Sequence, residues 1–418
     1  MRKRAERPEG YTERGQVIRL DPTYRQKNAM ARAAGCARFS FNWGLNEWGR
    51  QYRNGGKPNA NKLKRQFNAV KDKLFPWIYE SPKDANQEAF NDLGASFKNW
   101  FGWIRGKRKG RKVGYPRFKK RGRHDAFYLS NDKFSVHERG QRGLVRMSVI
   151  GTVRMQERLK LKGKNLSARA FRKADRWYIA IQVELDARVP HVHEHAIVGI
   201  DLGVKTAVVP SHGEPVDSPK PLKKALKQLS RANRRLSRRP TPGGQNRRKA
   251  KIQLAKCHER VANVRTNFLH QITTKIVREN QTVVIEDLNV QGMMRNHNLA
   301  RAISDVGMGM FRQMVTYKAS DYGSQIVVAD RWFASSKRCS RCGHVKDVLF
   351  LSERVYRCDK CGLVIDRDKN AALNLEQYPR LAGNLTPTDT GTSTFGLAPE
   401  ASAVVEVGTI PCPPLDTI

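Results

Sequence analysis

The chain has 418 residues, enough for two to four domains, and its 79 lysines and arginines against 38 aspartates and glutamates give a formal net charge of +41. This excess of one sign implies a polyanionic partner, and nucleic acid fits better than a membrane, because no apolar run reaches spanning length and the cations lie along the whole chain. The first residues carry no apolar segment of the kind that forms a signal peptide, which indicates a cytoplasmic protein.

The N-terminal part of the chain predicts a strand followed by a small helical bundle. Residues 10–20 read as a strand, and residues 23–52 carry large apolar side chains at roughly turn-length spacing, the pattern of a helix with one apolar face. Asn, Gly and Pro in residues 54–58 interrupt this pattern, and helical residues resume from 59 to 105. The helices therefore follow directly on an opening strand.

Lys83, Asn86 and Gln87 stand at positions that share one face of the last of these helices. Amine and amide donors of this kind read base edges in nucleic-acid complexes, so Lys83 and Gln87 are candidate nucleic-acid contacts. A solvated polar face is the simpler explanation for each residue taken alone.

Residues 105–123 combine glycines and cations so densely that they cannot form a core, so we expect a loop that binds phosphates. Two aromatic residues stand among its arginines and offer flat faces on which unpaired bases can stack. A disordered loop without a partner is the alternative, and it leaves the charge unexplained. The candidate contacts are Arg111, Lys112, Tyr115, Arg117, Phe118 and Lys119.

Residues 126–186 alternate with period two and have turn residues between the runs, which predicts several antiparallel strands. The clearest of them is Trp177–Glu184. Together with the opening strand they predict a small β-barrel into which the helical bundle is inserted. His191, His193 and His195 follow in a linker, and we expect them to be solvated rather than to bind a metal.

The second half of the chain alternates apolar strands with helices, the pattern of an α/β sheet. Residues 196–209 predict a buried strand, a turn at Asp201 and a second strand. Residues 282–288 predict another strand, which ends in carboxylates that include Glu286. A helix over residues 299–322 and one more strand follow.

Two long basic helices are predicted between these strands, over residues 219–239 and 246–280. On the second, six apolar residues at helical spacing predict a stripe that packs into the core; they are Cys257, Val261, Val264, Phe268, Ile272 and Ile276. Lysines and arginines occupy the other faces of both helices, which are therefore candidate nucleic-acid surfaces.

Four of the seven cysteines form two CxxC pairs with fifteen residues between them: Cys339, Cys342, Cys358 and Cys361. This spacing is typical of a tetrahedral four-thiolate zinc site. Four unrelated thiols or two disulfides are the alternatives. The fixed spacing, the missing secretory signal and the Lys and Arg neighbours that favour thiolates oppose them. We therefore expect a ribbon with a structural zinc.

Three carboxylates stand where the predicted elements deliver them to one edge of the sheet. Asp201 and Glu286 end strands, and Asp368 opens the helix that follows the second CxxC pair. Each alone has an ordinary explanation, as turn chemistry or as a helix N-cap. Together, in a chain with a net charge of +41, they predict a site for two Mg²⁺ ions that hydrolyses phosphodiesters.

Residues 199–203 also resemble the first phosphate loop of actin-like ATPases and sugar kinases, which are built on a related sheet. Those proteins need further glycine-rich adenosine motifs, which we do not find in this sequence, and they rarely carry so basic a surface. A single short motif of this kind is weak, so the ATPase interpretation is the minor one.

Seven motifs, taken in order, resemble those of the TnpB family, also called OrfB, the proteins of bacterial insertion sequences that are related to the type V CRISPR effectors. The motifs are residues 114–119, 177–180, 199–203, 265–270, 284–288, 335–343 and 366–372. Ala334 is a local departure, because the family often has proline at that place.

The resemblance implies a multidomain α+β fold. Its parts are a split wedge β-barrel with an inserted helical recognition domain, and a RuvC-like, ribonuclease-H-like α/β nuclease domain interrupted by a zinc ribbon. The expected boundaries are residues 1–21 and 126–195 for the barrel, 22–125 for the recognition domain and basic loop, 196–334 for the nuclease domain with its basic hairpin, 335–365 for the ribbon, 366–378 for the last nuclease segment and 379–418 for a disordered tail.

The resemblance also implies an RNA-guided endonuclease that cleaves double-stranded DNA beside a short adjacent motif, with a guide RNA made from the transposon end. Asp201, Glu286 and Asp368 take the positions of the catalytic residues, and Asp366 is the alternative for the third. Arg265 falls within a family motif and is a further candidate nucleic-acid contact. We expect a monomeric ribonucleoprotein that associates with the nucleoid. The alternatives are a non-catalytic RNA- and DNA-binding accessory or regulator of transposition and a protein that itself joins DNA strands.

Overall fold

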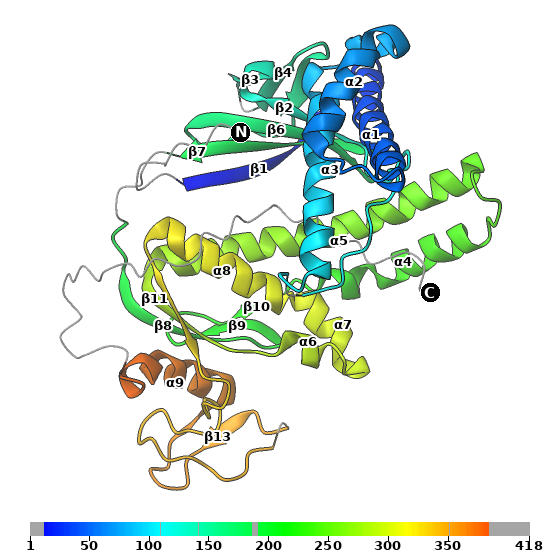
Figure 1. The fold of residues 1–418 in the computed structure, drawn as a ribbon. Coiled ribbons are helices and arrows are strands. Elements are labelled where there is room, and N and C mark those ends of the chain that lie inside the picture. Colours follow the sequence, from blue (N-terminus) through cyan, green and yellow to red (C-terminus); the bar gives the residue numbers. More distant parts are fainter. Residues whose placement is uncertain (1–11, 109, 141, 186–190, 351, 384–418) are drawn as a thin grey trace. The chain divides into compact units, whose positions relative to one another are not determined.

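The computed structural model describes residues 12–108, 110–140, 142–185, 191–350 and 352–383. These residues form two compact units, the first ending at Leu185 and the second beginning at His191. The first unit contains strands β1–β7 and helices α1–α3, and the second contains strands β8–β14 and helices α4–α9 (Figure 1). In the described part of the chain, no helix is long and apolar enough to cross a membrane.

The first unit begins with one strand and then three helices. Their bounds are β1 (Thr12–Asp21), α1 (Tyr24–Arg53), α2 (Ala60–Leu74) and α3 (Lys83–Ile104), with a 3-10 turn at Pro76–Glu80. A capping box starts α1, because the Thr23 hydroxyl accepts from the Gln26 amide while the Gln26 side chain accepts from the Thr23 amide. The bundle is held by buried aromatic and aliphatic side chains, among them Phe67, Phe90 and Leu93. The predicted helices and their interruptions are therefore confirmed.

The rest of the first unit is a seven-stranded antiparallel sheet in the order β2-β6-β7-β1-β5-β4-β3. The remaining strands are β2 (Ala126–Ser130), β3 (Phe134–Arg139), β4 (Arg142–Met147), β5 (Gly151–Met155), β6 (Lys164–Lys173) and β7 (Arg176–Leu185). Inward-facing residues of all seven strands meet in one apolar cluster, so the sheet curves around a single core. Among the described residues no ladder joins β2 to β3, so a closed barrel remains a prediction.

The second unit is built on a five-stranded sheet in the order β10-β9-β8-β11-β12 (Figure 1). The strands are β8 (His195–Asp201), β9 (Thr206–Pro210), β10 (Val216–Asp217), β11 (Asn280–Glu286) and β12 (Gln325–Ala329). β8, β11 and β12 are parallel, whereas β9 is antiparallel to both of its neighbours. The carboxyl ends of β8 and β11 therefore share one edge of the sheet, and they end at Asp201 and Glu286.

Helices cover both faces of this sheet. Their bounds are α4 (Pro221–Ser237), α5 (Gln245–Glu279), α6 (Val290–Met293), α7 (His297–Val306), α8 (Met308–Tyr322) and α9 (Arg367–Leu381). Residues of α5, α7 and α8, such as Leu269 and Phe311, form one core with β8 and β11. Leu375 of α9 packs with Val284 and Ala329 on the opposite face. The central strands are apolar on both sides for this reason.

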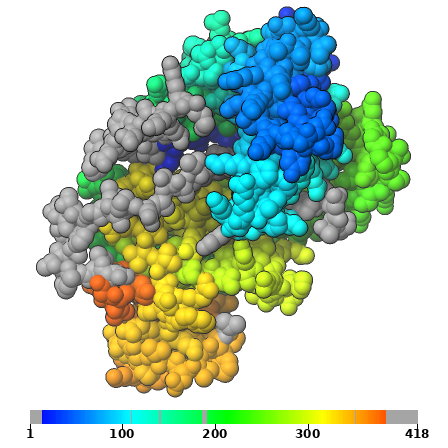
Figure 2. All heavy atoms as spheres, in the orientation of Figure 1, coloured from blue at the N-terminus to red at the C-terminus, as the bar shows by residue number. Residues whose placement is uncertain are grey.

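The ribbon segment, which carries the two CxxC pairs, lies between β12 and α9. Its short hairpin pairs β13 (Val355–Arg357) with β14 (Val364–Asp366), and Tyr356 is fully buried against the cysteines. The atoms of this segment gather in one lobe of the second unit, drawn yellow to orange in Figure 2. The last strand reaches Asp366, one residue beyond the boundary expected for the ribbon.

Several local predictions are wrong. The single helix expected over residues 299–322 is two helices, because Gly307 adopts a left-handed backbone with φ of 78° and ends α7. The apolar stripe expected on α5 is broken at Val264, which is 42% exposed; Val261 before it packs against α4 and Ile272 after it packs in the sheet core.

Two expected boundaries also shift. Residues 191–195 lie with the second unit rather than with the first sheet, since the Glu194 amide donates to the Glu279 carbonyl and β8 begins at His195. Helix α9 continues past residue 378 to Leu381, with Pro379 buried inside it. The disordered tail expected from residue 379 otherwise falls on residues 384–418, outside the described residues.

Candidate metal centres

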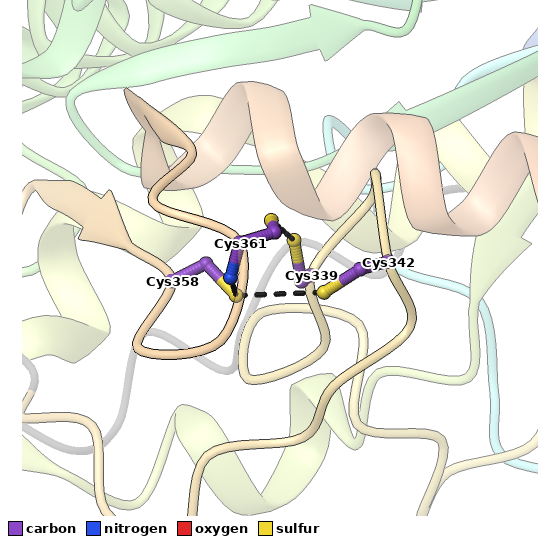
Figure 3. Close-up of side chains that lie close together, drawn as sticks. All are labelled: Cys339, Cys342, Cys358 and Cys361. Carbon is purple, nitrogen blue, oxygen red and sulfur yellow. Dashed lines mark hydrogen bonds between the residues drawn. The ribbon is translucent and has the colours of Figure 1, made fainter.

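The four cysteines of the ribbon face one point from two equivalent turns (Figure 3). Gly343 and Gly362 follow the second cysteine of each pair with φ of 74° and 69°, a left-handed backbone that glycine adopts without strain. Their amides donate to the carbonyls of Cys339 and Cys358, both at 3.0 Å. Each CxxC pair thus forms a closed turn that directs both of its sulfurs inward.

The spacing of the sulfurs fits a tetrahedral metal site. The Sγ atoms of Cys339 and Cys361 are 3.6 Å apart, as are those of Cys342 and Cys358, and all four lie within 4.8 Å of one another. A disulfide would bring two sulfurs to about 2.05 Å, whereas four thiolates about 2.3 Å from a zinc ion stand about 3.8 Å apart. The residues therefore fit zinc.

The second candidate centre lies at the sheet edge where β8 and β11 end. Gly199 in β8 makes this arrangement possible, because a Cβ atom there would stand 2.0 Å from the Ala372 carbonyl oxygen and 2.4 Å from the Glu376 amide nitrogen. Helix α9 can therefore lie directly against β8, with its first turn beside the end of that strand. This close approach brings Asp368 toward Asp201.

Glu286 and Asp368 both lie close enough to Asp201 to act on it: Ile285 pairs with Ile200, which sets Glu286 beside Asp201, and the charges of Glu286 and Asp368 both shift the pKa of Asp201. Burial raises the pKa of Asp201, the charges of Glu286 and Asp368 raise it further, and together these effects bring it to about 8. Carboxylates that repel one another in this way are the donors that a divalent cation prefers. Their donor chemistry fits magnesium.

The carboxylates are more widely spaced than the thiols. Among the described residues the cysteine cluster is the only group of three or more His, Cys, Asp or Glu whose ligand atoms all lie within 4.8 Å of one another. Glu286 accepts a hydrogen bond of 2.5 Å from the Ser335 hydroxyl, and Asp368 accepts from Arg367 at 3.2 Å. Each of these two carboxylates is thus held by its own partner.

Asp366 has a different role from Asp368. One of its side-chain oxygens accepts from the amides of Asp368 and Lys369, at 2.9 and 3.0 Å, so Asp366 is the N-cap of α9. Asp366 is exposed, whereas Asp368 is half-buried and acts on the pKa of Asp201. Geometry therefore favours Asp368 as the third member of the carboxylate site.

The candidate nucleic-acid residues of the basic loop are exposed, except for Lys119. Arg111, Lys112 and Arg117 are exposed, as is Phe118. Tyr115 is 47% exposed, with its ring edge-on to Phe97 and Trp100. These residues remain candidate contacts.

Lys119 differs from the other residues of that list, because its side chain is paired within the fold. Its ammonium pairs with Asp92 at 3.3 Å and lies 4.1 Å from the centre of the Phe41 ring, while its amide donates to Asn42. Burial lowers the pKa of this lysine, although Asp92 opposes the shift. Lys119 therefore fixes the end of the basic loop on α1 and α3 rather than presenting charge to a ligand.

Arg265 is likewise held inside the second unit. Its Nε donates to the Asp305 carbonyl at 3.0 Å, and its guanidinium pairs with the buried Asp305 carboxylate, which also accepts from the amides of Leu222 and Lys223. Arg265 thus joins α5, α7 and the start of α4. A nucleic-acid contact is not supported there.

The face proposed on α3 is only partly accessible. Lys83 is exposed and Gln87 is half-buried, so both remain candidates. Asn86 is 3% exposed and cannot read base edges from that position. The sequence places Lys83, Asn86 and Gln87 on one face of the helix, but it does not reveal that part of this face packs against the rest of the bundle.

Sequence reasoning missed the polar residues that join the ribbon to α9. Asn370 and Asn374 are both fully buried and hydrogen-bond to the backbone on either side of Cys339 and at Ser335. A signal was present, because two asparagines four positions apart lie on a helix face beside Ala371 and Leu375. Buried amides at such spacing predict a specific hydrogen-bonded contact.

Three family profiles match the chain. They are OrfB_IS605, described as a probable transposase, over residues 180–297; a Cas12f1-like TNB domain over residues 309–375; and a helix-turn-helix domain of OrfB_IS605 over residues 12–57. The structure differs from the last description, because residues 12–57 form β1 and the single 30-residue helix α1. The first two profiles cover the sheet edge and the ribbon.

Full-length relatives show the family. A Mycobacterium tuberculosis (strain H37Rv) protein named "Putative RNA-guided DNA endonuclease" is 33% identical, over 89% of this chain and 87% of its own. InsQ of Escherichia coli K12, which has the same description, is 30% identical over 86% and 90%. The solved Cas12f1–sgRNA–target DNA complex contains a chain that is 14% identical, with a TM-score of 0.55 over 88% of this chain and 99% of that one, a likeness of fold. The chain belongs to the TnpB (OrfB) family.

Proposed function

We propose that this protein is an RNA-guided, magnesium-dependent DNA endonuclease of an insertion sequence, which cleaves double-stranded DNA next to a short adjacent motif. The observation that carries the proposal is the convergence of Asp201, Glu286 and Asp368 at one sheet edge in a chain whose net charge is +41. The cations imply a nucleic-acid substrate, and the carboxylates supply the means to hydrolyse it. Relatives named as RNA-guided DNA endonucleases support the same activity.

The topology of the second unit supports a RuvC-type, ribonuclease-H-like nuclease. Its strand order, with β9 antiparallel beside β8 and with β11 and β12 parallel to β8, is the order expected of that sheet. In this proposal Asp201, Glu286 and Asp368 hold the divalent cations. When bound, a magnesium pair activates water and stabilises the leaving oxygen. The protein's part is to hold the three carboxylates on rigid elements at one edge of the sheet.

The substrate strand and the guide RNA are proposed to bind by their phosphates. Exposed cations of residues 105–123 and of α4 and α5 provide contacts that do not depend on sequence. Base pairing with the guide would then select the DNA site, and one chain with one guide RNA is the expected particle. Such a particle associates with nucleoid DNA in a bacterial cell.

A cleavage assay tests the proposal. The protein is purified with co-expressed RNA from the transposon end and given a plasmid with a matched target and Mg²⁺. We expect cutting by the wild type and none by Asp368→Ala. Asp366→Ala is the matched control two residues away: it removes a helix cap, which costs about 1 kcal/mol of stability, and retains cutting.

The alternative is a non-catalytic RNA- and DNA-binding accessory of transposition. Intact guide-dependent DNA binding without cutting, under conditions where the wild type is fully loaded with RNA and Mg²⁺, favours that alternative. Strand joining without RNA would instead favour a protein that itself moves DNA, in line with the "probable transposase" description of its family profile.

A further inference from the structure

The ribbon and the carboxylate site are joined by buried side chains that neither centre needs for its own ligands. Asn370 and Asn374 project from α9, which passes over the cysteine turns in Figure 3. Both are 0% exposed, and Ser335, at the turn between β12 and the first CxxC pair, is 4% exposed. Buried amides and hydroxyls are costly unless they are hydrogen-bonded, so their partners decide what they do.

Asn370 spans Cys339. Its oxygen accepts from the Ser340 amide at 3.0 Å and its nitrogen donates to the Arg338 carbonyl at 2.7 Å, so one side chain binds the residues directly before and after a zinc ligand. These two bonds also fix which end of the amide is oxygen, because the backbone supplies a donor on one side and an acceptor on the other. The turn that holds Cys339 is thereby tied to the helix that carries Asp368.

Asn374 extends this connection to the carboxylate site. Its nitrogen donates to the Arg338 carbonyl at 2.6 Å and to the Ser335 carbonyl at 2.8 Å. The hydroxyl of Ser335 in turn donates to Glu286 at 2.5 Å. Three consecutive links therefore run from the backbone beside Cys339 through Asn374 and Ser335 to Glu286.

We propose that Ser335 is a positioning residue for Glu286, and that the buried asparagines transmit the order of the zinc-bound Cys339 turn to it, so that the ribbon sets the divalent-cation affinity of the carboxylate site. Zinc fixes the Cys339 turn, and the asparagines fix Ser335 against that turn. Ser335 then holds one Glu286 oxygen and leaves the other to bind a cation. The inference rests on the proposed function, because it assigns cation binding to Asp201, Glu286 and Asp368.

Manganese binding to the full-length, zinc-loaded protein tests this coupling without any cleavage readout. Mn²⁺ prefers the same oxygen ligands as Mg²⁺, and its free form is counted directly by electron paramagnetic resonance. The Mn²⁺ binding that the wild type shows and the Asp201→Ala variant lacks is assigned to the carboxylate site. Zinc content is measured by mass spectrometry, and melting temperature is measured on the same samples.

We expect Ser335→Ala to weaken this Mn²⁺ binding about tenfold, the worth of a hydrogen bond to a charged group. Ser335→Thr keeps the hydroxyl and is expected to bind as the wild type does. Asn374→Leu keeps the branching of the side chain but removes its donors, and it should retain its zinc while weakening Mn²⁺ binding to a similar degree. The double variant of Ser335 and Asn374 should be no weaker than the weaker single variant, because both act through one path.

Gln377→Ala is the matched control. Gln377 stands on the same helix and donates from an exposed amide to the Ser340 carbonyl of the same turn, but it does not reach Ser335, so Mn²⁺ binding should be unchanged. If Asn374→Leu does not fold, Asn374→Ser takes its place with the same expectation.

The two levels of the proposal fail in different ways. If the wild type shows no Mn²⁺ binding that is lost on Asp201→Ala, the proposed carboxylate function and the coupling are both overturned. A wild type that has this Mn²⁺ site, but in which Asn374→Leu or Ser335→Ala leaves the affinity unchanged, overturns the coupling alone. Additive effects in the double variant would show two separate structural contacts and would also overturn it.

Discussion

Substitution of Gly199 by alanine should move Asp368, which lies on α9, away from Asp201 and Glu286, which end β8 and β11. The new Cβ atom would stand 2.0 Å from the Ala372 carbonyl oxygen and 2.4 Å from the Glu376 amide nitrogen, both of them backbone atoms of α9. Real Cβ atoms essentially never approach closer than 3.0 Å, so the helix must move away from β8 by about 1 Å or more. That movement carries Asp368 away from Asp201.

The loss of folding free energy that this displacement causes follows from the packing of α9 on that face of the sheet. Overpacking of a core costs about 1–3 kcal/mol, and backbone atoms relax less than side chains do, so we expect about 3 kcal/mol for Gly199→Ala. In a unit of this size that loss lowers the melting temperature by about 6–12 °C. Because a misplaced catalytic group costs about a hundredfold in rate, cleavage should fall at least that far at temperatures where the variant is folded.

Gly309→Ala provides the control. Gly309 lies in α8 of the same unit, and a Cβ atom there meets nothing within 4 Å, so the substitution should stabilise the helix by about 0.5–1 kcal/mol. Thermal unfolding followed by circular dichroism, with cleavage measured on the same samples, checks both variants. A Gly199→Ala protein that melts within about 1 °C of the wild type and cleaves at its rate would refute the close approach of α9 to β8.

Three further predictions concern the metals and the cations. Cys358→Ser should lower zinc content, measured by mass spectrometry, and lower the melting temperature, because it removes one of four thiolates; full zinc in a variant without Cys358 and Cys361 would refute four-thiolate binding. In buffer without added magnesium, the wild type should lose stability as pH rises from 3.8 toward 8, because the folded state holds the Asp201 proton that the unfolded state releases. Asp201→Asn should remove this loss in pH-dependent unfolding, and an unchanged pH profile would contradict it. Neutralising the exposed Arg111 and Lys112 should weaken RNA binding. It should also reduce the slope of log K against log salt concentration by about 0.7 per lost phosphate contact. Lys119→Gln should leave this slope unchanged, because Asp92 already holds that ammonium.

The strands and helices of both units were predictable because their signals are local. Apolar periodicity and turn residues identified β8 and β11, and the CxxC spacing identified the ribbon. Parallel pairing then brings Asp201 and Glu286 to one edge, which sequence order alone suggests but does not require. The helix break at Gly307 was missed, because a glycine inside an apolar helical pattern is often tolerated.

The roles of individual polar residues were less predictable, because they depend on partners far away in the sequence. Lys119 and Arg265 look like nucleic-acid contacts in their basic surroundings, but Asp92 and Asp305 hold them within the fold. The family resemblance favoured Asp368 over Asp366, and the structure gives the two different roles: Asp366 caps α9, whereas Asp368 acts on the pKa of Asp201. Ser335 has no local signal at all for its bond to Glu286, since forty-nine positions separate the two.

Cleavage of a matched plasmid by the RNA-loaded protein tests the central claim most directly. The wild type with transposon-end RNA and Mg²⁺ should cut at a fixed position beside the adjacent motif, and Asp201→Ala, with the same zinc and RNA content, should bind the target without cutting it. Wild-type protein that is loaded with RNA and does not cut, or cutting that survives Asp201→Ala, would contradict the account.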